Sequence, residues 1–218
     1  MLIAALMACA PPSASAQDEP PAPIGPVVFD LHGIMPSFPD DSQQLADSRA
    51  MLVSELPGRG MGIYAAAHVY PFKWKAVTFG IGADVTLVRA RQSAPVIAGV
   101  IVGRPVTEQF AHASPQISFN FGKGDGWSYI SAGYGPGQWS VVPDGDNPTD
   151  LDTLIQPIAN YGGGARWFIK RHFAFSLDVR IYAIVPRTGL PGFPAPPRTN
   201  LFSVGAGISY KPWAAKRR

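Results

Sequence analysis

Apolar and polar side chains alternate strictly along residues 173–184. The apolar positions are Phe173, Phe175, Leu177, Val179 and Ile181, and the positions between them are Ala174, Ser176, Asp178, Arg180 and Tyr182. A period of two places the two sets on opposite faces of a β-strand. The segment also has about the 9–11 residues that a tilted membrane strand needs, whereas strands in soluble proteins usually have about 5–6. The pattern therefore indicates a strand of a membrane β-barrel.

The same alternation predicts eight strands in all. They cover residues 27–35, 60–70, 77–88, 116–122, 127–134, 160–169, 173–184 and 201–210. The connections between them alternate between short segments (71–76, 123–126 and 170–172) and long ones (36–59, 89–115, 135–159 and 186–200). Bacterial outer-membrane barrels have short periplasmic turns and long extracellular loops. The sequence therefore predicts an all-β fold: an eight-stranded antiparallel up-and-down transmembrane barrel over residues 27–210, with four long outer loops.

Aromatic residues gather beside the short connections and near the last strand. Trp74, Trp127, Trp167, Tyr210 and Trp213 are the set that we expect to form an aromatic girdle at the periplasmic interface. All six lysines also lie on the short-turn side or in the tail, whereas most of the acidic residues lie in the long segments. This distribution supports the same orientation.

Charged residues inside the predicted strands lie opposite the apolar face. The expected lumen network consists of Asp30, His32, His68, Asp84, Arg166, Asp178 and Arg180. Buried charges are costly unless they are paired, and the interior of an eight-stranded barrel is just wide enough to be filled by side chains. We therefore expect the acids to pair with Arg166 and Arg180, His32 and His68 to pair with Asp30 or Asp84, and the lumen to be plugged. The alternative is a polar face exposed to water, as in a soluble sandwich.

The end of the last strand carries a motif that adds to the architecture. It reads Ser203-Val204-Gly205-Ala206-Gly207-Ile208-Ser209-Tyr210 and resembles the assembly signal of small outer-membrane barrels. With the eight segments, it makes residues 27–210 similar to the OmpA/OmpX-like group of barrels. The resemblance implies that outer-membrane lipid and the barrel assembly machinery are partners. Residues 211–218, which follow the motif, are interpreted as a basic periplasmic tail.

The N-terminal residues predict export. Residues 1–16 are interpreted as a signal peptide, because an apolar start is followed by the small-residue site Ala14-Ser15-Ala16. The alternative is lipidation at Cys9, the only cysteine, which excludes a disulfide within the chain. Residues 17–26 form a Pro-rich linker. The predicted location is the outer membrane of a bacterium with two membranes.

Composition narrows the function classes. Charged residues make up only 15% of the chain, against about 25% in soluble domains. The formal net charge of +3 comes without a basic cluster or a nucleic-acid motif, so no nucleic-acid partner is predicted. No cofactor is predicted either.

Candidate chemistry is sparse. His32, His68 and His112, with Ser114, are the residues from which a membrane lipid-modifying enzyme could build a His–Ser pair, but Pro115 follows directly and only Glu108 is a nearby acid. The acidic segment 144–152 lacks the spacing of an EF-hand loop, so no metal site is predicted. Gly162-Gly163-Gly164 is not predicted to be a phosphate loop, because neither a helix nor a lysine follows it. We therefore predict no catalytic residue.

Two of the long segments carry apolar residues. Residues 41–56 predict a short amphipathic helix that lies on the membrane or caps the barrel mouth, and residues 98–102 are unusually apolar for a surface loop. The preferred function is non-catalytic: envelope structure, or recognition of an extracellular ligand or envelope partner through the loops. The alternatives are a narrow pore, a lipid-modifying enzyme and a soluble ligand-carrying barrel.

Overall fold

The computed structural model describes residues 24–185 and 188–213. The predicted signal peptide, Cys9, most of the linker and the end of the tail lie outside the described residues. The barrel and nearly all of its connections lie within them.

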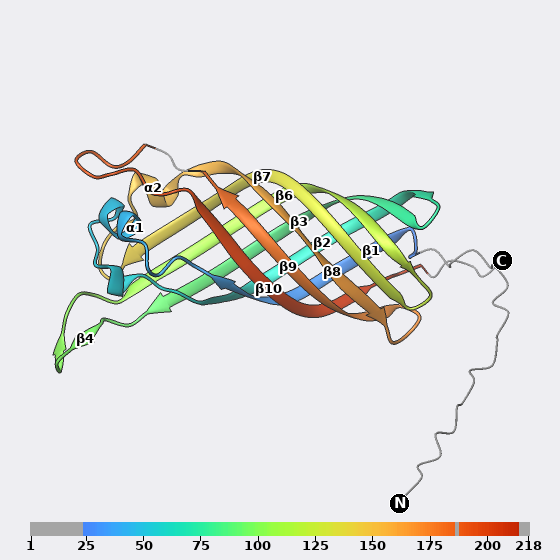
Figure 1. The fold of residues 1–218 in the computed structure, drawn as a ribbon, viewed down its shortest axis with the longest axis horizontal. Helices are drawn as coiled ribbons and strands as arrows, with labels where there is room; N and C mark the ends of the chain where they lie inside the picture. Colours follow the sequence, from blue (N-terminus) through green and yellow to red (C-terminus); the bar gives the residue numbers. More distant parts are fainter. Residues whose placement is uncertain (1–23, 186–187, 214–218) are drawn as a thin grey trace, which may run out of the picture.

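Eight long strands close into one antiparallel barrel (Figure 1). They are β1 (Val27–Ser37), β2 (Gly60–Trp74), β3 (Val77–Gln92), β6 (Val106–Lys123), β7 (Gly126–Pro143), β8 (Ile155–Phe168), β9 (Phe173–Ile184) and β10 (Thr199–Tyr210). Their order around the barrel is β1-β10-β9-β8-β7-β6-β3-β2, so each strand pairs with its neighbours in sequence among the eight, and β1 closes on β10. The predicted fold class, an eight-stranded antiparallel barrel, is confirmed.

Five small elements lie in the connections. They are α1 (Gln43–Ser48), the 3-10 helix η1 (Val53–Glu55), the strands β4 (Val96–Ile97) and β5 (Val100–Ile101), and α2 (Asp150–Thr153). All of them lie at one end of the barrel, here called the loop end, and the short turns lie at the other, the turn end (Figure 1). No helix in the described part of the chain combines the length and the apolar character needed to cross a membrane.

Two strands extend much farther toward the loop end than the sequence predicted. β6 begins at Val106 instead of residue 116, and β7 ends at Pro143 instead of residue 134. The outward side chains of these extensions include Thr107, Gln109 and Ser140. Polar residues in these extensions face outward as well as inward, so the alternation that marks a membrane strand is lost in the sequence. The backbone pairing of β6 with β7 nevertheless continues through them. The second and third long loops are correspondingly shorter.

A band of apolar side chains surrounds the barrel. On β3 the outward residues from Val77 to Leu87 are all apolar, and Arg89 and Arg91 follow on the same face. Ten residue steps at about 3.3 Å each and a tilt of about 40° span about 25 Å along the barrel axis. This height equals the apolar band of outer-membrane barrels, which is about 25 Å.

Apolar clusters close the barrel interior at both ends. At the turn end Ile24, Val28, Trp127, Phe168 and Ala174 pack together. The cluster at the loop end is larger and consists of Ile34, Phe38, Leu45, Ala46, Met51, Leu56, Tyr64, Ala66, Val88, Ala90, Val106, Phe110, Trp139, Val141, Ile158, Tyr182, Ile184 and Leu201.

The helix predicted over 41–56 is shorter and caps the mouth. Leu45 and Ala46 of α1 are fully buried in the cluster at the loop end, while Leu52 is exposed. The Ser42 hydroxyl accepts a hydrogen bond from the Leu45 amide and so caps the start of α1. Of the two placements expected for this segment, the structure has the cap.

Candidate functional site

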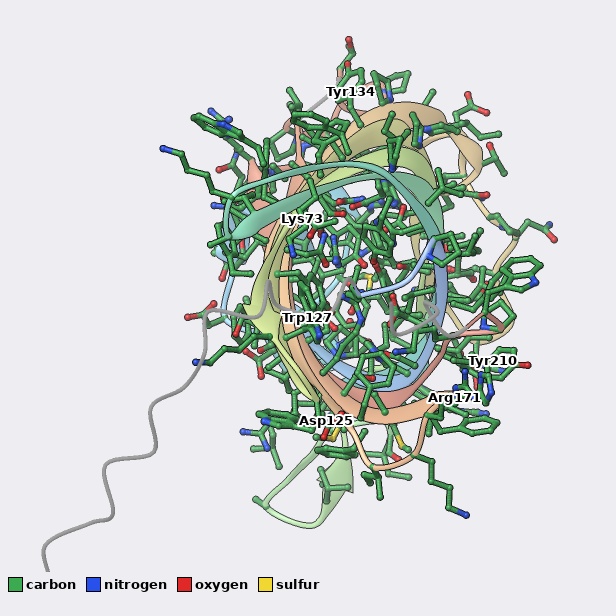
Figure 2. The ribbon with its side chains drawn as sticks, turned by 90° about the vertical axis from the view of Figure 1, so that its right-hand side faces the viewer. Lys73, Asp125, Trp127, Tyr134, Arg171 and Tyr210 are labelled. Atoms are coloured by element: carbon green, nitrogen blue, oxygen red, sulfur yellow. The ribbon has the colours of Figure 1, made fainter. Side chains whose placement is uncertain are left out.

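The polar layer between the two apolar clusters is the first candidate site. Strand alternation turns one side chain in two toward the lumen, so residues far apart in sequence meet there. Arg166 and Arg180 are the largest of the fully buried side chains. Figure 2, a view along the barrel from the turn end, shows side chains filling the ring of strands.

Arg166 forms the first ion pair of this layer. Its Nε and Nη2 donate to the two carboxylate oxygens of Asp30 at 2.9 and 2.7 Å, a bidentate geometry. Nη1 donates to Oδ1 of Asn120 at 3.1 Å, and the Ser209 hydroxyl donates to Asp30 at 2.5 Å. The guanidinium carbon lies 3.9 Å from the ring centre of Tyr129. The charge of each partner is thus compensated by an ion pair and by hydrogen bonds.

Arg180 forms the second ion pair. Its Nε and Nη2 each lie 3.2 Å from a carboxylate oxygen of Asp178. The guanidinium also donates to Ser131 at 3.0 Å and to Oδ1 of Asn160 at 3.2 Å. Its central carbon lies 4.7 Å from the ring centre of Tyr64.

Asp84 is held differently from the other two acids. It accepts hydrogen bonds from the Ser114 hydroxyl at 2.7 Å and from the Asn160 amide at 3.2 Å. Among the described residues no basic side chain forms an ion pair with it. The expectation that all three acids pair with Arg166 or Arg180 is therefore wrong for Asp84, because neutral donors occupy its carboxylate.

The two histidines of the predicted network do not pair with acids. Nε2 of His32 lies 2.7 Å from the Ser176 hydroxyl. Both ring nitrogens of His68 are buried without a hydrogen-bond partner in the described part of the chain, and its ring stacks on Tyr70 with the centres 6.4 Å apart. The structure places both in the lumen as expected, but it corrects their predicted partners.

The geometry does not bring His112 and Ser114 together as a His–Ser pair. His112 and Ser114, expected in a loop, both lie on the inner face of β6 and are buried. The Ser114 hydroxyl donates to Asp84, while the ring of His112 contacts the backbone oxygen of Ile158 and the Asn160 amide at 3.3 and 3.4 Å. Nucleophilic catalysis requires the base within hydrogen-bond reach of the hydroxyl, and no such bond joins these two residues in the described structure.

The acidic segment 144–152 makes ion pairs within the loop end. Asp152 is buried and pairs with Arg49, and Asp144 and Asp146 pair with Arg91 and Arg104 at 2.5 and 2.8 Å. Within the described ranges no group of three or more histidines, cysteines or acids is arranged to hold a metal ion. This segment therefore ties the loops together.

The aromatic residues expected in a girdle fall into two groups. Trp74, Trp167, Tyr210 and Trp213 are exposed near the turn end. Trp127 differs, because it is only 3% exposed and lies inside the ring of strands, whereas Tyr210 lies outside it (Figure 2). Its Nε1 donates to the backbone oxygen of Gly124 in the adjacent turn at 3.2 Å. Trp127 is therefore part of the turn-end cluster and not of a girdle.

A cation also packs at the turn end. Nζ of Lys211 lies 4.1 Å from the ring centre of Phe168. Burial lowers the pKa of this ammonium, and the nearby Asp125 carboxylate opposes that effect. Lys211 thus covers the turn-end cluster where the last strand leaves the barrel.

The loop end is the second candidate site, and buried polar contacts hold it together. The Arg49–Asp152 pair joins the segment after α1 to α2. The Glu55 carboxylate accepts hydrogen bonds from the amides of Leu52 and Arg104 at 2.7 and 2.6 Å. Sequence reasoning missed these contacts, because nothing in the spacing of Arg49, Glu55 and Asp152 distinguishes them from exposed loop charges.

The β4–β5 hairpin projects beyond this folded end (Figure 1). Val96 pairs with Ile101 and Ile97 with Val100 around a turn at Ala98 and Gly99. All four paired side chains are at least 60% exposed. The apolar character noted in the sequence thus belongs to an uncovered hairpin tip.

Solved structures with the same kind of fold were found. Neisserial surface protein A shares 13% identity over 85% of this chain and 95% of its own, with a TM-score of 0.45. Ail of Yersinia pestis, solved with the heparin analogue sucrose octasulfate, shares 11% over 84% and 97%, with a TM-score of 0.44. The N-terminal barrel of Pseudomonas aeruginosa OprF shares 11% over 85% and 97%, with a TM-score of 0.40. No protein-family description and no curated protein matches the sequence.

Proposed function

We propose that this chain is a non-catalytic barrel of a bacterial outer membrane that presents a folded recognition surface outside the cell. The observation that carries the proposal is the continuous belt of exposed apolar side chains around a barrel whose interior is polar and filled. A soluble protein rarely exposes an apolar area of this extent. Lipid is the environment in which the belt is favourable.

Differences between the two ends of the barrel support an orientation with the turn end in the periplasm. Exposed aromatic residues gather near the turn end, and the long, structured connections all lie at the other end. The proposed extracellular surface is therefore formed by α1, η1, α2 and the β4–β5 hairpin.

The filled interior supports a barrel that is closed to solutes over one that conducts them. A solute would have to pass the turn-end cluster, the two arginine ion pairs and the loop-end cluster. Opening that route would separate buried charges, which costs several kcal/mol for each pair, on the order of 3–5 kcal/mol. We therefore favour the sealed barrel over the narrow pore.

Planar-bilayer recording of the refolded protein tests the sealed barrel. We expect no reproducible conductance steps from the native chain. Stable steps of one size, seen in independent preparations, would instead establish the pore. Recovery of the protein from cells in the soluble periplasmic fraction would contradict the membrane proposal itself.

The proposed recognition surface is tested at its exposed tip. Replacing residues 96–101 by a polar Gly-Ser turn removes the four exposed apolar side chains and leaves the barrel ladder intact. We expect weaker binding of purified protein to cell surfaces or envelope fractions. The matched control replaces 191–194, an exposed part of the β9–β10 connection, and equal binding by both variants would exclude the hairpin.

A further inference from the structure

Three arginines gather on the outer wall of the barrel at the edge of the apolar band. Arg59, Arg89 and Arg91 line a groove of about 380 Å³ together with Gly60, Met61 and Ala90. All three arginines are exposed. Their position on the wall, and not in the loops above it, distinguishes this cluster from the recognition surface.

The strand register fixes the height of the cluster. Arg89 is opposite Met61 on β2 and Gln109 on β6. The next outward row toward the turn end contains Leu87, which is opposite Ile63 and Ala111. The change from apolar to charged residues therefore occurs within one row, about 7 Å along the strand.

The charge of the cluster is only partly compensated. Arg91 pairs with Asp144 at 2.5 Å, and their side chains are 58% and 38% exposed. In the described part of the chain this is the only ion pair that involves the three arginines. Three cations next to one carboxylate leave an excess positive charge on a surface that borders the membrane.

We propose that Arg59, Arg89 and Arg91 bind the phosphate groups of a membrane lipid in the leaflet around the loop end. The planar guanidinium fork matches phosphate geometry and binds it through paired hydrogen bonds. A lipid headgroup lies at the edge of the hydrocarbon layer, the height at which these arginines follow Leu87. The exposed side chains of Met61, in the row of Arg89, and of Leu87, in the next row toward the turn end, would contact the acyl chains of the same lipid. The inference rests on the proposed membrane location and adds a specific lipid class to it.

Binding of three probes to the folded full-length barrel in detergent micelles tests the site. The probes are lipid A with two phosphates, the same lipid with both phosphates removed, and inorganic phosphate, and native mass spectrometry reports the bound fraction. We expect Arg59→Gln/Arg89→Gln to weaken binding of the phosphorylated lipid by about tenfold or more, as loss of charge-assisted hydrogen bonds does. The matched control, Arg171→Gln in the exposed turn at the opposite end (Figure 2), should bind within about twofold of the native chain.

Each arm has an outcome that overturns the site. Equal binding of the lipid with and without phosphate would exclude phosphate recognition, and undiminished binding by the double variant would exclude these arginines. Inorganic phosphate that competes at the same concentration as the lipid would exclude a lipid-specific site. If the double variant does not fold, Arg89→Gln alone is compared with Arg171→Gln. Failure of the native chain to enter membranes would refute the proposed function, whereas a folded, membrane-embedded barrel without this preference refutes only the lipid site.

Discussion

At the scale of single residues, the interior depends on pairs of charges that stay compensated only together. Arg166 and Asp30 are both almost completely buried, and Arg166 donates two hydrogen bonds to the Asp30 carboxylate. Removal of one partner of such a pair leaves the other as an uncompensated buried charge. The stability lost on substituting one partner therefore depends mainly on the buried charge of the partner that remains.

Asp30→Asn should lower the free energy of unfolding by about 3–5 kcal/mol, because the buried Arg166 loses its counter-charge. Urea titration of the protein in lipid vesicles measures this change. The matched control is Asp146→Asn, whose exposed pair with Arg104 should be worth about 1 kcal/mol or less. In Asp30→Asn/Arg166→Met both charges are gone, so this double variant should be more stable than Asp30→Asn. Equal losses for the single and double variants would contradict the pairing.

At the scale of elements, the strand register decides which residues meet lipid. In β9 Leu177 is 41% exposed and Asp178 is 4% exposed, and they are opposite Ala206 and Gly205 of β10. A slip of one residue would exchange every inward and outward side chain of the strand. Substitutions at these two adjacent positions should therefore differ sharply.

Leu177→Arg should cost about 2–4 kcal/mol of folding free energy in lipid, because it places a charge on the lipid face near the midplane. The control is Gln109→Arg, an outward position in the row of Arg89, where we expect a change within about 0.5 kcal/mol. Folding into vesicles, followed by the heat-dependent shift in electrophoresis, measures both. A tolerated Leu177→Arg would mean that the register is wrong by one.

The sequence predicted the strands best where lipid faces one side. β9 has the predicted bounds, because its outward side is apolar from Phe173 to Ile181. The bounds of β6 and β7 were wrong where the strands rise above the band. Trp127 was misassigned because an aromatic residue near a turn fits both a girdle and an interior plug, and the phase of its strand is obscured by Tyr129, which also faces inward.

The sequence predicted which residues face the lumen better than it predicted which of them contact one another. Period-two alternation placed Asp30, Asp84, Asp178, Arg166 and Arg180 on the inner face. It could not show that Ser114 and Asn160 occupy the Asp84 carboxylate. Which residues meet across the lumen depends on strand tilt and stagger, and these are properties of the closed barrel and not of one strand.

At the scale of the whole molecule, the loop end is a folded cap on a rigid wall. Contacts between connections that are distant in sequence, above all Arg49–Asp152, hold α1 and α2 over the mouth. The barrel ladder does not depend on them. Opening of the cap and unfolding of the barrel should therefore be separate events.

Arg49→Ala should loosen the cap while the barrel stays folded, because it leaves Asp152 without its charged partner. Tryptic cleavage after Arg59, which is exposed, precedes Gly60 and lies in the same connection as α1, should accelerate about tenfold, the factor that about 1.4 kcal/mol produces. Mass spectrometry of the fragments measures it. Arg198→Ala, at an exposed position of the β9–β10 connection, is the control. An unchanged cleavage rate would show that the buried pair does not hold the cap.

The long sequence separation of the interior contacts has a consequence for assembly. The Arg166–Asp30 pair joins residues 136 apart, and the Ser209–Asp30 hydrogen bond joins residues 179 apart. Arg180 and Asp178 lie on the same strand and can pair before the barrel is complete. Asp30 on β1 would enter the hydrocarbon unpaired if its hairpin inserted alone, because Arg166 lies on β8. These two charges are compensated only when the barrel closes, so closure and entry into the bilayer should form one cooperative step. The Asp30–Arg166 pair thus disfavours insertion of an incomplete barrel, because such a barrel would carry unpaired charges into the hydrocarbon.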